Sequence, residues 1–422
     1  MQEPLVNWAG NYRYSTDRLH HAASVGDVQS FVRQHQHLRV LGTRHGFNGI
    51  ADSAHDLLSI RGMARVLAVN ASAGTVTVEG GISYGQLCPE LDRHGFALHN
   101  LASLPHISVA GACATATHGS GVANGNLATA VSALEIVTAS GDIVTLSRDR
   151  DPVNFHGAVV NLGALGVVTR LTLDVEPRYD MRQDVYLHLP LAHVADHFEA
   201  IVASGYSVSL FTTWEHDRID AVWIKRRVAD GDAQTADAGF YGAPLASVNV
   251  HPIIELSAEP CTAQMGVPGP WYERLPHFRM GFTPSSGTEL QSESFVPRQH
   301  AVDAIATVQR LRAQVSPLLM VSELRTVDAD ELWLSPCYRQ PSLAMHFTWK
   351  PDWDAVRQVL PMIERELSPF GVRPHWGKLF TLAPDTLQAR YEKCDEFRRL
   401  AAQFDPTATF RNAFLAATLY RA

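Results

Sequence analysis

Three glycine-rich segments in the first 170 residues could bind an anion. They are GTRHGFNG (42–49), VAGACATATHGSGVANG (109–125) and NLGALGVV (161–168). Glycines and small residues let successive backbone N–H groups approach phosphate oxygens without the help of a lysine. One such turn is a weak signal because turns of this kind are common. Three of them, two with a histidine, indicate a site for a cofactor that contains pyrophosphate.

Two later segments predict strands with one polar face. Residues two apart in a strand share a face, so SELRTV places Glu323 beside Arg325, and LAMHFTWK places His346 beside Thr348. A solvated sheet face with a cross-strand ion pair fits this pattern as well as a pocket wall for a neutral, polyhydroxylated ligand does. Lys378 in PHWGKLF is a further candidate, although an exposed lysine is the commoner case.

The usual nucleotide-binding motifs do not occur in the chain. It contains neither GxxxxGK[ST] nor a GxGxxG between a strand and a helix, which disfavours a dinucleotide on a Rossmann turn. The five cysteines are far apart and odd in number, so we predict buried thiols rather than disulfides or a structural zinc site. We predict no metal site.

The order of predicted elements indicates two sheet-based domains. Short strands alternate with short helices over the first 175 residues, as in a mixed α+β domain. From residue 178, strands and helices follow in an order typical of an antiparallel sheet with helices on one face, so that the other face must contact something else. An irregular Pro- and Gly-rich stretch at about 240–288 interrupts this order and is too long for an ordinary connection.

Length and charge narrow the class of protein. A chain of 422 residues exceeds the size at which a single core stops growing, about 250–300 residues. Its 35 Lys and Arg against 43 Asp and Glu give a net charge of −8 without a basic block, which argues against a nucleic acid partner. No stretch approaches the ~18 apolar residues of a membrane-spanning helix, and the start lacks a leader pattern. We therefore expect a soluble, cytoplasmic protein without a membrane partner, and a monomer by default.

Seven segments together resemble one family. They are NWAGN (7–11), VLGTRHGFN (40–48), NLASLPHISVAGACATATHGSG (100–121), GVPGPWYERLPHFR (266–279), ELRT (323–326), RPHWGK (373–378) and FDPTATFRNAF (404–414). The chain resembles the bacterial alditol oxidases (xylitol or sorbitol oxidases), which belong to the vanillyl-alcohol-oxidase group of FAD enzymes. The resemblance implies a two-domain α+β fold: an FAD-binding domain (1–177), a substrate-binding cap domain with an antiparallel sheet (178–370), and a C-terminal segment (371–422) that returns to the FAD region.

The resemblance also implies how FAD is held. His45, which the pattern alone would leave as a surface loop histidine, corresponds to the histidine that is covalently joined to the 8α carbon of the flavin. Doubly linked relatives carry a second link through a cysteine, and the corresponding Ala102-Ser103-Leu104 has none, so we expect a single link. Arg44 departs from the family, which often has serine or glycine there, and could alter attachment. The other FAD contacts implied are Leu41, Gly42, Thr43, Arg44, Gly46, Phe47, Ser103, Ser108, Gly111, Thr115, His118, Gly119, Gly121, Gly166 and Val167.

The resemblance implies the oxidation of a terminal hydroxyl of a sugar alcohol to an aldose by hydride transfer to flavin N5, with O2 reduced to H2O2. The alditol-binding residues carried over are Ser103, Glu323, Arg325, His346, Thr348 and Lys378. Among the catalytic candidates Glu323, Arg325, His346 and Lys378, arginine suits the stabilisation of a developing alkoxide, whereas Lys378 and His346 remain alternatives for the base. Two other functions stay open: an aldonolactone-type flavin dehydrogenase with another electron acceptor, and a non-catalytic flavin- or sugar-binding protein.

Overall fold

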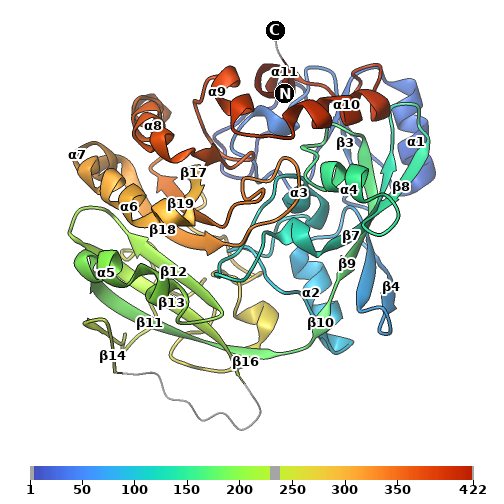
Figure 1. Cartoon of the computed structure of the whole chain (residues 1–422). Coiled ribbons are helices and arrows are strands. Elements are labelled where there is room, and N and C mark those ends of the chain that lie inside the picture. The colour runs from blue at the N-terminus through green and yellow to red at the C-terminus, as the bar shows by residue number, and fades with distance from the viewer. Residues whose placement is uncertain (1–3, 229–237, 421–422) are drawn as a thin grey trace.

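Two sheet-based regions lie side by side, and the C-terminal helices lie across both (Figure 1). The computed structural model describes residues 4–228 and 238–420. The first region contains a three-stranded parallel sheet and a five-stranded sheet, and the second contains an eight-stranded sheet. This arrangement is the α+β architecture that the element order predicts.

The parallel sheet has the order β1-β3-β2 and packs against one amphipathic helix. Its elements are β1 (Leu19–His21), α1 (Val25–Gln34), β2 (Leu38–Val40) and β3 (Asp56–Ser59). Helix α1 begins at Ser24, whose side chain accepts a hydrogen bond from the backbone N–H of Asp27, as an N-cap residue does. Val28 and Val32, one turn apart on the same face, are buried against the sheet.

The five-stranded antiparallel sheet has the order β4-β5-β9-β7-β8. It and its neighbouring elements are β4 (Val66–Asn70), β5 (Thr75–Glu79), α2 (Tyr84–Arg93), β6 (Phe96–Ala97), α3 (Val109–Ala114), β7 (Val131–Val137), β8 (Ile143–Ser147), α4 (Pro152–Val159), β9 (Val167–Asp174) and β10 (Glu176–Pro177). Ser83 and Gln86 form a capping box at the start of α2, and this reciprocal pairing satisfies two backbone donors.

The second region is an antiparallel sheet with the order β16-β11-β13-β12-β18-β19-β17-β20. Its strands are β11 (Asp180–Pro190), β12 (Ser207–Thr212), β13 (Arg218–Val228), β16 (Gly269–Pro270), β17 (Leu290–Pro297), β18 (Leu319–Val327), β19 (Ser342–Trp349) and β20 (Arg373–Pro374). The short strands β14 (Gly239–Phe240) and β15 (Ala243–Pro244) form a separate pair.

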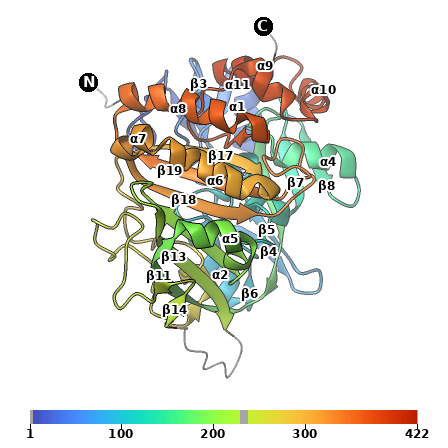
Figure 2. The same cartoon turned by 60° about the vertical axis from the view of Figure 1, so that its left-hand side comes forward.

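Helices cover one face of this sheet, as Figure 2 shows. They are α5 (Leu191–Val202), α6 (Ala301–Arg310), α7 (Arg312–Val315) and α8 (Trp353–Leu367). Leu324, Met345 and Phe347 point toward these helices and share one buried cluster with them. Because side chains alternate along a strand, the residues between them point to the opposite face, which meets the first region.

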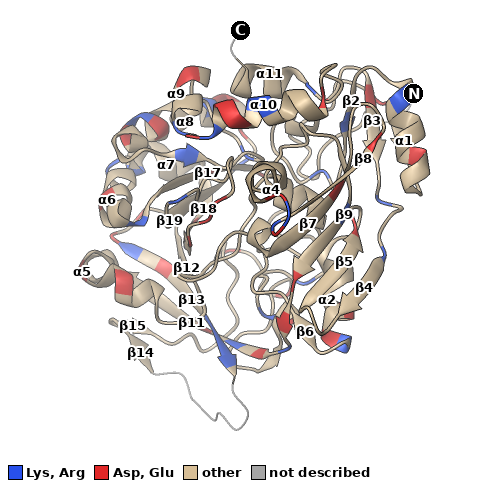
Figure 3. Cartoon of the chain, turned by 45° about the vertical axis from the view of Figure 1, so that its right-hand side comes forward, with Lys and Arg blue, Asp and Glu red and all other residues tan. Residues whose placement is uncertain are grey.

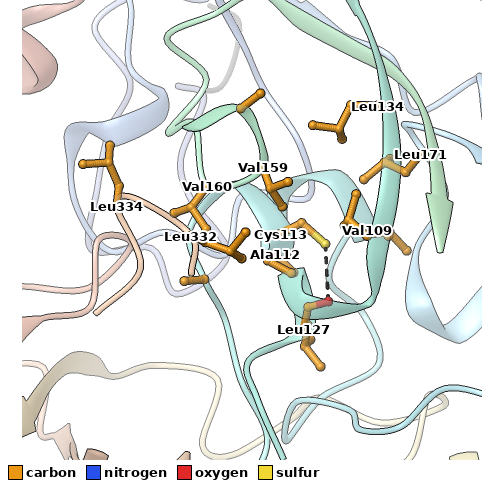
Figure 4. Packing of buried hydrophobic residues seen from close by; sticks show 14 of the residues in the cluster. Val109, Ala112, Cys113, Leu127, Leu134, Val159, Val160, Leu171, Leu332 and Leu334 are labelled. Carbon is orange, nitrogen blue, oxygen red and sulfur yellow. Dashed lines mark hydrogen bonds between the residues drawn. The ribbon is translucent and has the colours of Figure 1, made fainter. Parts of the chain in front are cut away.

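The C-terminal segment joins the two regions. Its helices are α9 (Pro384–Ala389), α10 (Cys394–Phe404) and α11 (Ala413–Leu419). Phe397 of α10 and Leu415 of α11 belong to the main core of the first region. Leu332 and Leu334, which follow β18, enter the same core beside Val160 (Figure 4). The two regions are therefore fixed to one another by shared apolar packing.

The distribution of surface charge and the burial of the cysteines agree with the sequence analysis. Lys and Arg lie interspersed with Asp and Glu over the described part of the chain (Figure 3). All five cysteines are buried and free, as predicted. None of the helices among the described residues has the length and apolar character needed to cross a membrane.

Candidate active site

A large cavity lies where the first region meets the face of the eight-stranded sheet that is opposite the helices, which we call the bare face. Its empty space is about 1950 Å³, including the part open to solvent. All three predicted glycine-rich turns contribute to its lining, and so do β17, β18 and β19. His375, Gly377 and Lys378 also line it. The cavity thus extends from the glycine-rich turns to the polar face of the sheet.

His45 lies in this cavity with neither ring nitrogen hydrogen-bonded. The ring stacks on Trp8 with 5.5 Å between the ring centroids. Burial lowers the pKa of His45 to about 4, so the imidazole is neutral near pH 7. The turn around it is held by the N-terminal segment, because Trp8 donates to the carbonyl of Arg44 (2.8 Å) and Asn7 donates to that of Gly46 (2.9 Å). A buried ring with two unpaired nitrogens is a site that a covalently attached ligand can satisfy.

The His45 turn is also tied to the C-terminal segment. The backbone N–H of Phe47 donates to the carbonyl of Gly377 (2.8 Å). The amide of Asn48 donates to the carbonyls of Trp376 (2.9 Å) and Lys378 (2.7 Å). These three bonds place the loop that carries His45 against the loop that carries Lys378.

Arg44 does not contact the imidazole through a hydrogen bond. Its guanidinium donates to the carbonyl of Val6 (3.1 Å), and its backbone has a φ of 64°. The left-handed conformation is one that non-glycine residues adopt rarely, so this residue accepts strain in order to form the turn.

The first two glycine-rich turns pack closely against each other. The backbone N–H of Ser108, the N-cap residue of α3, donates to Oγ1 of Thr43 (3.1 Å). A Cβ at Gly42 or Gly111 would lie 3.0 or 2.7 Å from the Ser108 hydroxyl oxygen. A side chain at either position would crowd this hydroxyl, and the surface formed by the two turns is made largely of backbone.

The third turn is held by a buried arginine. Arg39 donates to the carbonyls of Leu162 (2.7 Å), Gly163 (2.7 Å) and Phe410 (2.8 Å). Gly166 lines the cavity with a φ of 139°, and a Cβ there would lie 2.2 Å from the carbonyl oxygen of Val137. Only glycine fits this position.

Three of the residues predicted as FAD contacts, Gly119, Gly121 and Val167, do not line the cavity. Gly119 packs so tightly that a Cβ would lie 2.3 Å from the carbonyl oxygen of Leu101, and Gly121 donates its N–H to the carbonyl of Thr326 (2.9 Å). Val167 is fully buried in β9, and its neighbours Gly166 and Val168 line the cavity instead. The first two glycines shape the backbone, and the alternation of the strand turns Val167 into the core. The other predicted cofactor residues do line the cavity.

The six predicted substrate residues all line the cavity, on the bare face of the sheet and the loops around it. Glu293 on β17, His346 on β19 and Glu323 on β18 lie directly opposite one another across three neighbouring strands. Arg325 and Thr348, two residues further along their strands, share this face. The prediction from strand periodicity is confirmed, and the face is a pocket wall rather than a solvated surface.

Glu293 is the centre of the charged wall. One carboxylate oxygen lies 2.9 Å from the Arg325 guanidinium and 3.2 Å from Nε2 of His118, and the other lies 2.7 Å from the Lys378 ammonium. Burial alone would raise its pKa, but Lys378, His118 and Arg325 together hold the pKa of Glu293 well below its usual value. Its side chain is fully shielded from solvent. A permanent anion therefore fixes two cations at the end of the cavity.

The protonation of His346 follows from its partners. Lys378 Nζ lies 2.8 Å from its Nδ1, and Thr348 Oγ1 lies 3.0 Å from its Nε2. Burial and the nearby Lys378 charge lower the pKa of His346 well below its usual value, so the ring is neutral. An ammonium can only donate, so Nδ1 accepts and Nε2–H donates to Thr348. Burial also lowers the pKa of Lys378.

Arg325 and Glu323 complete the wall. Arg325 donates to the hydroxyl of Ser103 (3.1 Å), and its Nε lies 3.5 Å from a carboxylate oxygen of Glu323. The second oxygen of Glu323 lies 2.7 Å from Nε2 of His277. Although burial opposes its ionisation, Arg325 and His277 hold the pKa of Glu323 below its usual range. The wall thus offers cations, carboxylates and hydroxyls within one buried network.

Glu293, His277 and Trp8 were missed by the sequence reasoning. Glu293 had a detectable signal, because Glu289, Gln291 and Glu293 alternate along ELQSESFVP just as the polar residues of the two predicted faces do. His277 and Trp8 lie in irregular segments, where no periodicity marks a residue that reaches the cavity.

One cluster outside the cavity has metal-ligand residue types. His20, His35 and Asp56 bring donor atoms within 4.8 Å of one another. His20 already bonds Asp56 (2.9 Å), and Arg18 lies 3.6 Å from the same carboxylate. The carboxylate therefore has charged and hydrogen-bonding partners without a metal ion.

Comparison with known proteins shows the family of this chain. The chain is 46% identical over 418 residues to an alditol oxidase from Streptomyces sp., covering 98% of this chain and 99% of the relative. The chain belongs to the alditol oxidase family. A family model for an FAD-binding domain matches residues 17–147, and one for D-arabinono-1,4-lactone oxidase matches residues 289–418. The first region thus contains an FAD-binding domain.

More distant similarities also extend over nearly the full length of the chain. The chain is 27% identical to an L-gulono-1,4-lactone dehydrogenase from Mycobacterium tuberculosis, with 97% of each chain covered. The crystal structure of a cholesterol oxidase from B. sterolicum is similar in fold, with a TM-score of 0.79 at 15% identity over 99% of this chain and 97% of that chain. The predicted vanillyl-alcohol-oxidase type of FAD fold is confirmed.

Proposed function

We propose that the chain is an FAD-dependent alditol oxidase that converts a terminal CH2OH group and O2 into an aldehyde and H2O2. The observation that carries this proposal is the buried wall of Glu293, Glu323, Arg325, His346 and Lys378 in the same cavity as His45. The full-length similarity to an alditol oxidase supports it. Two protons and two electrons leave the carbinol and reach oxygen, so the reaction balances.

FAD, when bound, accepts a hydride from the carbinol carbon and passes the electrons to O2. The residues that would hold it are His45 and the backbone of the three glycine-rich turns. We propose a single covalent link through His45, because its neutral ring has an unpaired nitrogen that can bond to the flavin 8α carbon. The substituted ring would remain fixed by its stacking on Trp8.

A polyol needs a partner for every buried hydroxyl, since an unmatched one costs about 1–3 kcal/mol. Glu323 would accept from inner hydroxyls, while Ser103 and Thr348 can both donate and accept. Arg325 and Lys378 would bind the terminal oxygen. The wall supplies donors and acceptors in a buried space, which suits a neutral ligand rich in hydroxyl groups.

Arg325 would stabilise the alkoxide character that develops as the hydride leaves. It stays charged, because Glu323 and Glu293 raise its pKa despite burial. The Lys378–His346 pair is joined by a 2.8 Å hydrogen bond and titrates as a unit. The hydroxyl proton would pass to this pair when Lys378 is in its neutral amine form. Burial lowers the pKa of Lys378 and so favours its action as a base.

The test of this role is Arg325→Ala. We expect kcat with xylitol to fall about 10²–10³-fold, as when one oxyanion donor is lost, while the flavin content stays unchanged. Arg339→Ala, at an exposed ion pair, is the control. An Arg325→Ala enzyme with the kcat of the wild type would contradict the assignment.

The covalent link has a separate test. Acid precipitation of the wild type should give a yellow pellet, and digestion should leave the flavin on the peptide that contains His45. The pellet of His45→Ala should be colourless. A colourless wild-type pellet would refute the link without refuting the oxidase activity.

A second candidate, a lactone-type flavin dehydrogenase, is favoured by the dehydrogenase relative. The match of residues 289–418 to the D-arabinono-1,4-lactone oxidase family suits a lactone substrate but not a dehydrogenase. Peroxide formed per alditol consumed in air separates the two functions, because an oxidase gives one to one. A binding protein without activity would show no flavin bleaching when xylitol is added without oxygen. A monomeric state and a cytoplasmic location remain predictions.

A further inference from the structure

Lys225 is buried beside the charged wall, on the same face of the eight-stranded sheet. It lies on β13 with 1% of its surface exposed. Its Nζ donates to three consecutive backbone carbonyls, those of Arg274 (2.7 Å), Leu275 (2.6 Å) and Pro276 (3.0 Å). The ammonium has three N–H groups, and they are shared among these carbonyls and Nδ1 of His277 (3.3 Å). Burial lowers the pKa of Lys225 to about 7, so keeping this amine in the interior is costly.

The segment that Lys225 holds continues into the cavity. The backbone N–H groups of His277 and Phe278 both donate to the carbonyl of Ser103 (2.8 and 3.1 Å). The hydroxyl of Ser103 in turn accepts from Arg325 (3.1 Å). The position of Ser103 thus depends on the segment that the buried lysine binds.

The ring of His277 makes a second connection from Lys225 to the wall. Its Nδ1 lies 3.3 Å from Lys225 Nζ, and its Nε2 lies 2.7 Å from Glu323 Oε1. Glu323 is ionised, so Nε2 must carry the proton. Burial lowers the pKa of His277 to about 4, so the ring is neutral and its Nδ1 has a lone pair. An N–H of Lys225 that is shared with a carbonyl therefore donates to Nδ1 and supports the tautomer that donates to Glu323.

We propose that Lys225 is a positioning residue for alditol binding, which places Ser103 through the segment 274–278 and Glu323 through His277. The inference rests on the proposed oxidase function and extends it to a residue that does not contact the substrate. It explains why a cation is buried on the strand two places away from β18. The contact with His277 is not needed for a lysine that only stabilises the fold, because the three carbonyls already bind its ammonium.

The experiment is a comparison of Lys225→Met and His277→Phe with the wild-type holoenzyme, using xylitol in air. We expect KM to rise about tenfold or more, because a charged hydrogen-bond partner is no longer held in place. We expect kcat to change less than about threefold, because Arg325 is untouched. Flavin absorbance per chain should equal that of the wild type.

Two further variants sharpen the result. In Lys225→Met/His277→Phe, the rise in KM should be smaller than the product of the single effects, because residues in one hydrogen-bonded chain are not additive. Lys350→Met is the control, since Lys350 also donates to a carbonyl, that of Pro317 (2.8 Å), but on the surface. It should leave KM unchanged.

The outcomes separate the inference from the function. A wild type active on xylitol, with flavin-loaded variants of unchanged KM or of lower kcat at constant KM, would overturn the positioning role alone. A wild type inactive on every alditol would overturn the oxidase function and this inference together. If Lys225→Met does not fold, His277→Phe decides, because it leaves all three carbonyl contacts of Lys225 in place.

Discussion

The two walls of the cavity are built by opposite means. The FAD-binding domain presents turns whose surface is mainly backbone, held by glycines at positions such as Gly42 and Gly166. The eight-stranded sheet presents charged side chains that project from paired strands and bond one another, with Glu293 at the centre. The glycine-rich wall fits its ligand by shape, whereas the wall on the eight-stranded sheet does so by charge. The glycine-rich wall should therefore be sensitive to added side-chain volume, and the charged wall to the loss of a charged group.

The largest effect is expected from Glu293→Gln. Removing one partner of a buried ionic network leaves Arg325 and Lys378 without their shared anion and should cost about 3–5 kcal/mol of unfolding free energy. Urea unfolding measures it. Glu331→Gln is the matched control, because Glu331 and Arg339 pair at 2.9 Å with 54% and 60% of their side chains exposed. It should cost less than about 1 kcal/mol. Equal losses in the two variants would refute the contrast between buried and exposed pairs.

On the opposite wall, Gly81→Ala should be the sensitive change. A Cβ at Gly81 would lie 2.0 Å from the carbonyl oxygen of Ile60, and overpacking of this kind costs about 1–3 kcal/mol. We expect a lower flavin content per chain as well as lower stability, because Gly81 lines the cavity. Gly281→Ala, where a Cβ meets nothing within 4 Å, should change neither. Normal flavin content in Gly81→Ala would show that the turn tolerates a methyl group.

The smallest effect on stability is expected from the titration of His45, an ionisable group of the glycine-rich wall whose two ring nitrogens are unpaired. Its folded pKa of about 4 lies below the unfolded value of about 6.5. Its contribution to stability is therefore complete above pH 6.5 and is lost as the pH falls toward 4. Between pH 6.5 and 5.5 this amounts to about 1 kcal/mol.

Flavin-free wild type should consequently lose more stability over this interval than flavin-free His45→Phe. Chemical denaturation at the two pH values measures the difference. His277 and His375 are also buried and neutral, but they contribute equally to both proteins and cancel. An identical pH dependence of the two proteins would mean that His45 is accessible to protons in the folded state.

The sequence allowed a good prediction of the charged wall on the eight-stranded sheet and a partial prediction of the glycine-rich wall. Strand periodicity placed Glu323, Arg325, His346 and Thr348 on one face, because a period of two is a local property. The same rule cannot show that β17 pairs with β19 and β20, and this non-sequential strand order brings Glu293 and Lys378 to the wall.

The glycine turns were found by composition, but the role of each glycine was not. Gly119 and Gly121 are in the same segment as Gly111 and yet pack against the core, because their roles depend on which backbone passes nearby. Family resemblance, rather than spacing, singled out His45. Its two unpaired nitrogens could be seen only in the folded chain.

The position of α10 and α11 in the core of the FAD-binding domain sets the order of events during synthesis. Phe397 and Leu415 complete a core most of whose other members lie in the first half of the chain. Domains that fold on the ribosome begin from the N-terminus, but this one lacks part of its interior until α10 and α11 emerge. We therefore expect cofactor loading to follow the synthesis of these helices, and a nascent chain that stops before α10 should not retain flavin.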